Sequence, residues 1–155
     1  MGGRASSEVT YVERLVPPPS LFAAVWGFAL ALGVSFYAAL GPVAFGVALL
    51  GPGLAGTVLL VSTVAEVRVA DGQVSAGLAR IPVTALGPAR PLDAEQARRV
   101  RGPESDPAGY HLIRGWIRCG VLAEVVDPTD PTPYWFLASR DPQRLAAAIE
   151  AARRA

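Results

Sequence analysis

A continuous apolar stretch separates two polar parts of the chain. Between Arg14 and Glu66 lie 51 consecutive residues without Asp, Glu, Lys, Arg or His. A helix needs about 20 apolar residues to cross a bilayer, so this length predicts two membrane-spanning helices. We expect them over Leu21–Leu40 and Val43–Thr63, because Gly41-Pro42 between them favours a turn.

The two apolar segments differ in their small residues and helix breakers. The second contains Gly51-Pro52-Gly53, which predicts either a kinked span or a re-entrant segment. In the first segment a small residue recurs at every fourth position, in the row Ala23, Gly27, Ala31, Ser35 and Ala39. Such rows let helices approach closely, although an alanine-rich chain also produces them by chance. If the row is functional, we expect it to pack against compatible small residues of the second span, Ala44, Ala48 and Gly56.

Arginines flank the apolar stretch, while the connection between its two segments carries no charge. Arg4 and Arg14 precede the stretch, and Arg68 and Arg80 follow it. The positive-inside rule then predicts a multi-pass protein of the cell membrane with both termini cytoplasmic. The alternative is a cleaved signal peptide. It is disfavoured because the apolar region is far too long and the residues before it contain as many Glu as Arg.

From Val64 onward the pattern becomes alternating, which is typical of strands with one buried face. Asp71-Gly72 is a strong signal for a two-residue hairpin turn. A helix is expected over Leu92–Arg101, capped by Asp93 and ended by Gly102. The strands are expected over Val64–Val69, Val74–Ala79, Ile81–Leu86, Tyr110–Arg114, Trp116–Cys119, Val121–Val126 and Tyr134–Ser139.

The chain ends in an amphipathic helix. Asp141 is placed to cap it and Pro142 to occupy its first position. We therefore predict an α+β protein, in which a two-helix transmembrane hairpin is followed by a small β-barrel or curved antiparallel sheet with a C-terminal capping helix. The expected parts are an N-terminal cytoplasmic tail over residues 1–20, the hairpin over 21–63 and a cytoplasmic β-rich domain over 64–155.

Composition argues against several classes of function. The net charge is +1, which leaves no concentrated basic surface of the kind that binds nucleic acid. Cys119 is the only cysteine and His111 the only histidine, so no intramolecular disulfide and no ordinary zinc site is expected. No cofactor motif is present. Neither apolar segment contains an ionisable group of the type that lines ion pathways.

Charged and aromatic residues of the polar domain supply candidate interaction sites. Arg98, Arg99 and Arg101 form the densest basic cluster. Near an anionic leaflet each would add about 1 kcal/mol of attraction, while the plain alternative is a solvated helix face. Glu13-Arg14, just before the apolar stretch, is most simply an interfacial ion pair.

A proline-rich run holds the remaining candidates. Asp127 and Asp130 match general acid–base or cation chemistry, but turn formation explains them more simply. Tyr134 and Trp135 follow directly, and they either pack on the domain or sit among lipid headgroups. A catalytic role for His111 is disfavoured because a lone histidine on a strand is usually structural. A pair with Cys119 is disfavoured because their separation of eight residues matches no known geometry.

Several of these blocks together resemble one known family. They are Tyr11-Val-Glu-Arg-Leu15, the two apolar segments, Ala76-Gly-Leu-Ala-Arg-Ile-Pro82, Asp127-Pro-Thr-Asp-Pro-Thr-Pro-Tyr-Trp135 and Ser139-Arg140. The chain is similar over nearly its whole length to an actinobacterial family of two-span membrane proteins, domain of unknown function 3093. The polar part is also similar in layout to bacterial pleckstrin-homology-like domains. The resemblance implies a membrane location but no activity.

We therefore expect a non-enzymatic, membrane-anchored interaction module without a cofactor. Its expected partners, besides the bilayer, are a membrane protein or anionic lipid headgroups, and not nucleic acid. Two alternatives stay open. One is a small membrane enzyme that uses Asp127, Asp130 or His111, and the other is an accessory subunit of a membrane complex that acts through its spans.

Overall fold

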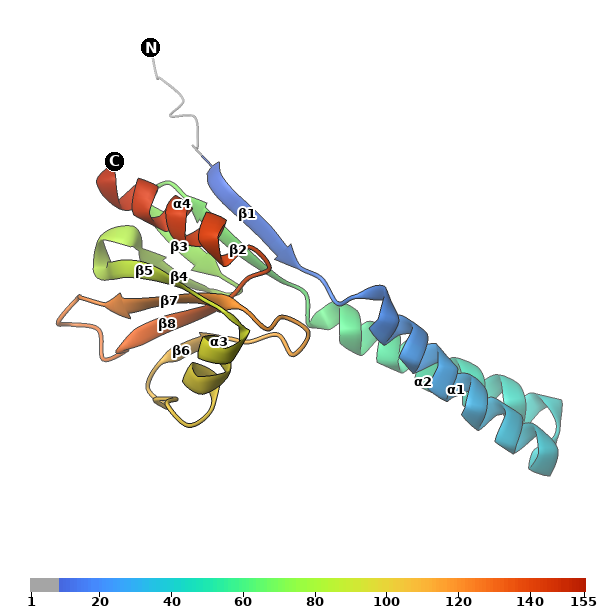
Figure 1. The fold of residues 1–155 in the computed structure, drawn as a ribbon. Coiled ribbons are helices and arrows are strands. Elements are labelled where there is room, and N and C mark those ends of the chain that lie inside the picture. Colours follow the sequence, from blue (N-terminus) through green and yellow to red (C-terminus); the bar gives the residue numbers. More distant parts are fainter. Residues whose placement is uncertain (1–8) are drawn as a thin grey trace, which may run out of the picture. The chain divides into compact units, whose positions relative to one another are not determined.

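The chain forms two compact units, one of which is inserted into the other (Figure 1). The computed structural model describes residues 9–155, so Arg4 lies outside the described residues. Among the described residues, one unit consists of residues 9–15 together with Ala65–Ala155, and the other of Val16–Val64. The inserted unit is helical, and the chain on either side of it belongs to a single α+β domain.

The inserted unit is a pair of long apolar helices, α1 (Pro19–Leu40) and α2 (Pro42–Ser62). Both agree with the predicted segments to within two residues. Their mean hydropathies are 1.9 and 2.0, and both are long and apolar enough to cross a membrane. Gly41 joins them with a positive φ of 86°, which glycine adopts without strain. Since α2 continues through Pro52, the break that a re-entrant segment requires is not formed.

The two helices contact each other where large side chains of α1 pack against glycines of α2. A Cβ on Gly53 would lie 2.8 Å from Cζ3 of Trp26, and one on Gly56 would lie 2.6 Å from Cγ1 of Val25. The Trp26 indole N–H also donates to Oγ1 of Thr57 at 3.2 Å. The prediction that the row of small residues on α1 packs against α2 is wrong. All members of that row are exposed in the hairpin, namely Ala23, Gly27, Ala31, Ser35 and Ala39.

The first sheet of the domain joins the two sides of the insertion. Its strands are β1 (Val9–Leu15), β2 (Ala65–Ala70), β3 (Gln73–Ala76) and β4 (Ala79–Pro82), in that order and all antiparallel. The predicted turn at Asp71-Gly72 is confirmed, with φ values of 52° and 68°. Strand β1 was not predicted, since residues 1–20 were expected to form a tail. Its partner strand follows the whole apolar stretch in the sequence, so no local pattern indicates the pairing.

The second sheet is not purely antiparallel. Its strands are β5 (Leu86–Leu92), β6 (Tyr110–Leu112), β7 (Gly120–Val125) and β8 (Tyr134–Ala138), in the order β5-β7-β8-β6. Strand β6 pairs in parallel with β8. The two sheets do not close into a barrel within residues 9–155, because the 3₁₀ turn η1 (Val83–Ala85) separates β4 from β5. The strand expected over Trp116–Cys119 is a loop.

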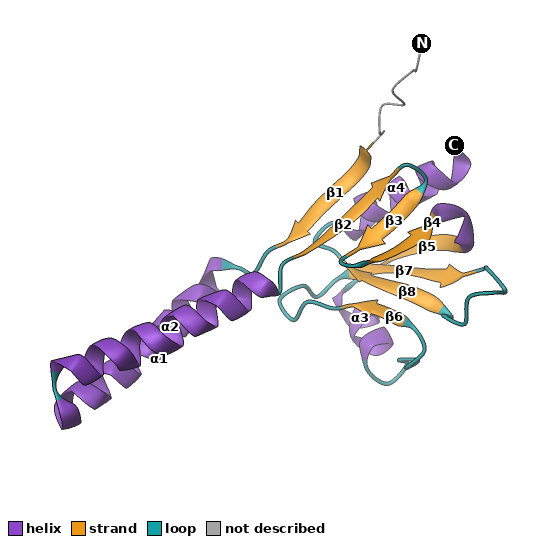
Figure 2. Cartoon of the chain, turned by 180° about the vertical axis from the view of Figure 1, so that it is seen from behind, coloured by secondary structure: helices purple, strands orange, loops and turns teal. Residues whose placement is uncertain are grey.

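Two helices complete the domain, and both use the predicted caps, although α3 begins two residues after the predicted Leu92, which ends β5. Helix α3 (Ala94–Arg101) has a capping box built on Asp93, and α4 (Pro142–Arg154) is capped by Asp141. Helix α4 packs against the strands of the domain (Figure 2). It buries Leu145 and Ile149 in a hydrophobic core to which both sheets contribute. The backbone N–H of Ala89 donates to Glu150 at 2.8 Å and ties α4 to β5.

Candidate functional site

Both aromatic candidates pack on the domain, Trp135 inside its core and Tyr134 partly buried against it. Trp135 is 5% exposed and stacks against Tyr110 with ring centroids 4.3 Å apart. The Tyr134 hydroxyl accepts the Asp106 backbone N–H at 2.8 Å and lies 3.1 Å from Nε2 of His111. Of the two interpretations of this pair, packing on the domain is therefore the one that the structure shows.

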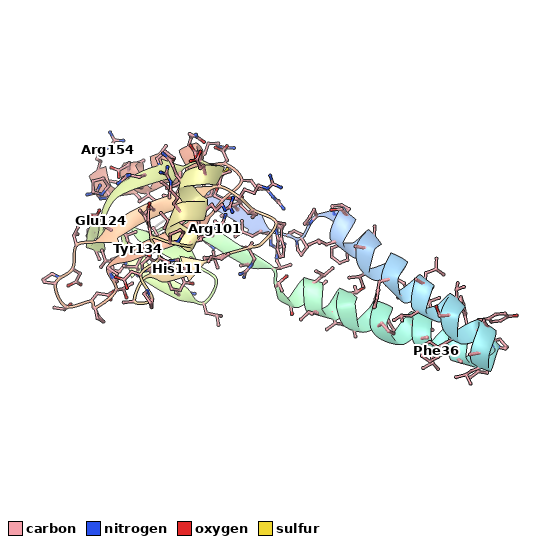
Figure 3. All side chains as sticks on the ribbon, turned by 60° about the horizontal axis from the view of Figure 1, so that its bottom comes forward. Phe36, Arg101, His111, Glu124, Tyr134 and Arg154 are labelled. Carbon is pink, nitrogen blue, oxygen red and sulfur yellow. The ribbon has the colours of Figure 1, made fainter. Side chains whose placement is uncertain are left out.

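The only histidine is held in one tautomer by its neighbours. Nδ1 of His111 lies 2.9 Å from the Gly109 carbonyl oxygen, which can only accept, so Nδ1 carries the proton. Nε2 then accepts from the Tyr134 hydroxyl, and Figure 3 labels both residues. Both ring nitrogens are thus used to fasten the loop before β6 to β8.

The two carboxylates of the proline-rich run close local turns. Oδ1 of Asp127 accepts the backbone N–H of Thr129 at 2.9 Å and its hydroxyl at 2.7 Å, and these bonds lower the pKa of Asp127. Oδ1 of Asp130 accepts the backbone N–H of Thr132 at 2.8 Å. The turn interpretation explains both residues. Across the described residues, no group of three or more His, Cys, Asp or Glu side chains is placed to hold a metal ion.

The basic cluster divides into one structural arginine and two open ones. Arg101 donates from its three guanidinium nitrogens to the carbonyls of Ala97, Ile117 and Arg118, and it lies 5.8 Å above the ring of Phe136. Arg98 and Arg99 are exposed. With Arg118, Arg98 lines an open hollow of about 410 Å³ on α3. The side chains of Arg98, Arg99 and Arg118 have no hydrogen bond or ion pair within residues 9–155. Their positive charges are therefore available to an anion.

We expect Arg101→Gln to lower the free energy of unfolding of the domain by about 2 kcal/mol, because three carbonyl contacts and the packing on Phe136 are lost. Arg98→Gln is the matched control on the same helix, and it should change the free energy by less than about 0.5 kcal/mol. Urea unfolding of the full-length protein in detergent micelles measures both. Equal effects of the two substitutions would contradict this division of the cluster.

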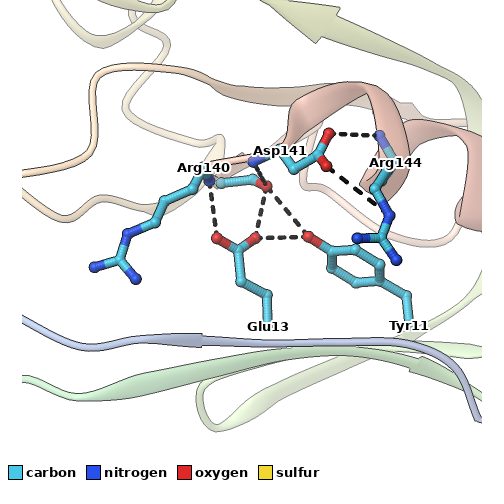
Figure 4. A network of polar contacts seen from close by, with 6 residues as sticks. Tyr11, Glu13, Arg140, Asp141 and Arg144 are labelled. Carbon is cyan, nitrogen blue, oxygen red and sulfur yellow. Dashed lines mark hydrogen bonds and ion pairs between the residues drawn. The ribbon is translucent and has the colours of Figure 1, made fainter.

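A polar network that the sequence did not indicate joins β1 to the corner before α4 (Figure 4). The Glu13 carboxylate accepts the Ser139 hydroxyl at 2.6 Å, the Tyr11 hydroxyl at 2.8 Å and the Arg140 backbone N–H at 2.8 Å. Ser139 is fully buried, and its oxygen also accepts the Asp141 backbone N–H at 3.1 Å. The interfacial pair expected from Glu13-Arg14 is not formed, because Arg14 pairs with Glu66 on β2 at 3.7 Å.

Burial raises the pKa of Tyr11 to about 12 from its ordinary value of 10.0, and the neighbouring Glu13 carboxylate adds to this effect. The neutral phenol is therefore favoured by folding. Its contribution to stability should be complete below pH 10.0 and lost as the pH rises towards 12. Burial also raises the pKa of Tyr110, so ultraviolet titration of tyrosinate should show more than one late-ionising group, of which one disappears in Tyr11→Phe. A titration in which Tyr11→Phe removes an ordinary tyrosine step would contradict the expectation.

Comparison with known families places the chain in one of them. The family model described as a protein of unknown function, DUF3093, matches residues 10–149. The chain belongs to this family. Its matched range contains both apolar helices, the Glu13–Ser139 network and the proline-rich run. No curated protein and no solved structure matches the chain.

Proposed function

We propose that this member of the family is a non-enzymatic, membrane-anchored interaction module. In this proposal α1 and α2 cross the cell membrane, and the α+β domain lies with both termini on the cytoplasmic side. There the domain binds a membrane protein or anionic lipid headgroups. A pleckstrin-homology-like domain next to two spans would suit such a role.

The observation that carries the proposal is the apolar surface of the helix pair. Leu40, Val43 and Val47 expose 70%, 79% and 69% of their surfaces, and no charged residue lies on either helix. Burying apolar surface is worth roughly 25 cal/mol per Å², so two such helices would be unstable in water. A bilayer supplies the environment that this surface requires.

The side chains that would serve an enzyme favour the non-enzymatic proposal. Asp127 and Asp130 close turns, and both nitrogens of His111 are engaged. A general acid or base has to reach the proton that it transfers. Replacing these residues with Asn or Gln should therefore remove no activity beyond what a loss of stability explains.

Fractionation tests the membrane part of the proposal. The full-length protein should sediment with membranes and stay in the pellet after an alkaline carbonate wash, because its spans are held by the hydrocarbon core. A peripheral protein of the same cells, released by the same wash, is the control. Release of the protein into the supernatant would contradict the proposal.

The accessory-subunit alternative is favoured by the outward position of the small-residue row on α1, at a spacing that lets helices pack closely. A hairpin exchange separates the two functions. The segment 19–62 is replaced by an unrelated apolar hairpin of equal length, and the proteins that copurify in mild detergent are compared. A partner that is retained binds through the α+β domain, as the module proposal expects, and a partner that is lost binds through the spans.

A further inference from the structure

The turn between β3 and β4 presents a leucine to solvent. Leu78 has a relative exposure of 105%, while Gly77 before it makes the turn with a φ of 63°. A lone exposed leucine is ordinary on a protein surface. A functional role for Leu78 can be argued only from the residues around it and from its position near the connections to the helices.

A second exposed apolar residue lies at the same end of the domain. Ile113 follows β6 directly and is 39% exposed. Two contacts bring this end of β6 to the turn. The Tyr110 hydroxyl donates to the Ala76 carbonyl at 2.7 Å, and a Cβ on Gly77 would lie 3.8 Å from Cδ1 of Leu112. The exposed apolar groups of the turn and of the loop after β6 therefore share one edge.

This edge is also the one where the chain leaves the domain for α1 and returns from α2. Leu15 and Ala65 are register partners, and the Gly77 N–H donates to the carbonyl of Glu66, the residue after Ala65, at 3.0 Å. Only residues 16–18 and 63–64 connect the domain to the helices. Three extended residues span at most about 10 Å. If the helices cross a bilayer, the chain itself keeps this edge close to the membrane surface.

The charges of the edge are mainly positive. Arg14 is next to Leu15, and its side chain is 73% exposed and pairs with Glu66 at 3.7 Å. Arg114 follows Ile113, and Arg118 is exposed in the same loop, where Glu95 of α3 lines the same hollow. Two donors of this loop, Nε of Arg114 and Nε1 of Trp116, are buried without an acceptor in the described part of the chain. A buried atom cannot reach an external acceptor, so Arg114 contributes its charge to this edge, and its Nη1 donates to the Ile113 carbonyl at 2.8 Å.

We propose that this edge docks on the membrane. Leu78 and Ile113 insert among the headgroups of a leaflet that contains anionic lipid, and Arg14, Arg114 and Arg118 contact the lipid phosphates. The inference rests on the proposed function and deepens it, since it names the docking surface and the lipid class. We call the five residues the docking edge.

A depth measurement on the full-length protein tests the proposal. Leu78→Cys is made in a Cys119→Ala background, labelled with an environment-sensitive fluorophore and placed in nanodiscs of phosphatidylcholine with phosphatidylglycerol. The probe should be blue-shifted, and it should be quenched by a nitroxide on the headgroup. Gln73→Cys is the matched control, because Gln73 is exposed at the opposite end of β3. Its probe should stay unquenched.

A third probe separates this inference from the proposed function. Leu30→Cys on α1 is half exposed and should be quenched by a nitroxide deep in the acyl chain. Loss of deep quenching at Leu30 overturns the proposed function and the inference with it. Deep quenching at Leu30 without headgroup quenching at Leu78 overturns the inference alone, as does equal quenching at Leu78 and Gln73. A Leu78 probe that shifts only when another membrane protein is added also overturns it in favour of a protein partner.

Arginine substitutions test separately how much the positive charges contribute to docking. Arg14→Gln and Arg118→Gln should each shift the docking equilibrium of the Leu78 probe about fivefold towards the undocked state in phosphatidylglycerol nanodiscs. They should have little effect in phosphatidylcholine alone. Equal effects in both lipids would contradict a role for anionic headgroups. Arg90→Gln, an exposed arginine on β5, is the control for the change of net charge.

Discussion

Glu13→Ala is expected to lower the free energy of unfolding of the α+β domain by about 3 kcal/mol, because three hydrogen bonds to a carboxylate are lost together. The Ser139 hydroxyl is fully buried, so water cannot replace the lost acceptor without entering the core. Urea unfolding of the full-length protein in detergent micelles, followed by tryptophan fluorescence, measures the change.

Glu66→Ala is the matched control for this prediction, on the strand beside β1. Glu66 and Arg14 form an ion pair at 3.7 Å with both side chains largely exposed. Exposed pairs contribute about 0.2–1 kcal/mol, so this substitution should have a small effect. If both substitutions cost the same, the Glu13 network does not fasten β1 to the corner before α4.

Phe136→Ala should be the most destabilising single change that we predict, at about 4 kcal/mol. Phe136 is fully buried on β8, the strand that pairs with both β7 and β6. Its ring lies beneath Arg101 and near His111. Removing the ring therefore leaves a cavity and also takes away the surface on which the guanidinium of Arg101 rests. The same urea titration checks the value.

Leu78→Ala is the control for a large apolar residue that is not buried. Since Leu78 is completely exposed, its truncation should change the free energy of unfolding by less than about 0.5 kcal/mol. A cost close to that of Phe136→Ala would show that Leu78 packs inside the domain. It would also remove the basis for the docking edge.

Local signals in the sequence were enough to predict much of the fold. The length of the uncharged stretch predicts two apolar helices, and α1 and α2 are found there. Asp71-Gly72 predicts its turn, and the caps Asp93 and Asp141 predict the starts of α3 and α4. Each of these signals acts between residues that are close in sequence. Helices, turns and caps of this kind can therefore be predicted without knowledge of the tertiary structure.

The features that sequence reasoning missed depend on distant partners. Strand β1 pairs with β2 across the whole insertion, and β6 pairs in parallel with β8. The bond between Glu13 and Ser139 joins residues 126 positions apart. The same limit applies to the candidate residues. Nothing local distinguishes Arg101, which is held by three carbonyls, from Arg98, which is open to solvent.

The most direct test of the proposed function is the side of the membrane on which the hairpin connection and the C-terminus lie. Val43→Cys, at the connection, and Ala155→Cys, at the C-terminus, are made separately in a Cys119→Ala background and exposed in intact cells to a membrane-impermeant maleimide. We predict that Val43→Cys is labelled in intact cells and that Ala155→Cys is labelled only after permeabilisation. Labelling of Ala155→Cys in intact cells, or of Val43→Cys only after permeabilisation, would contradict a membrane-spanning hairpin that holds the domain in the cytoplasm.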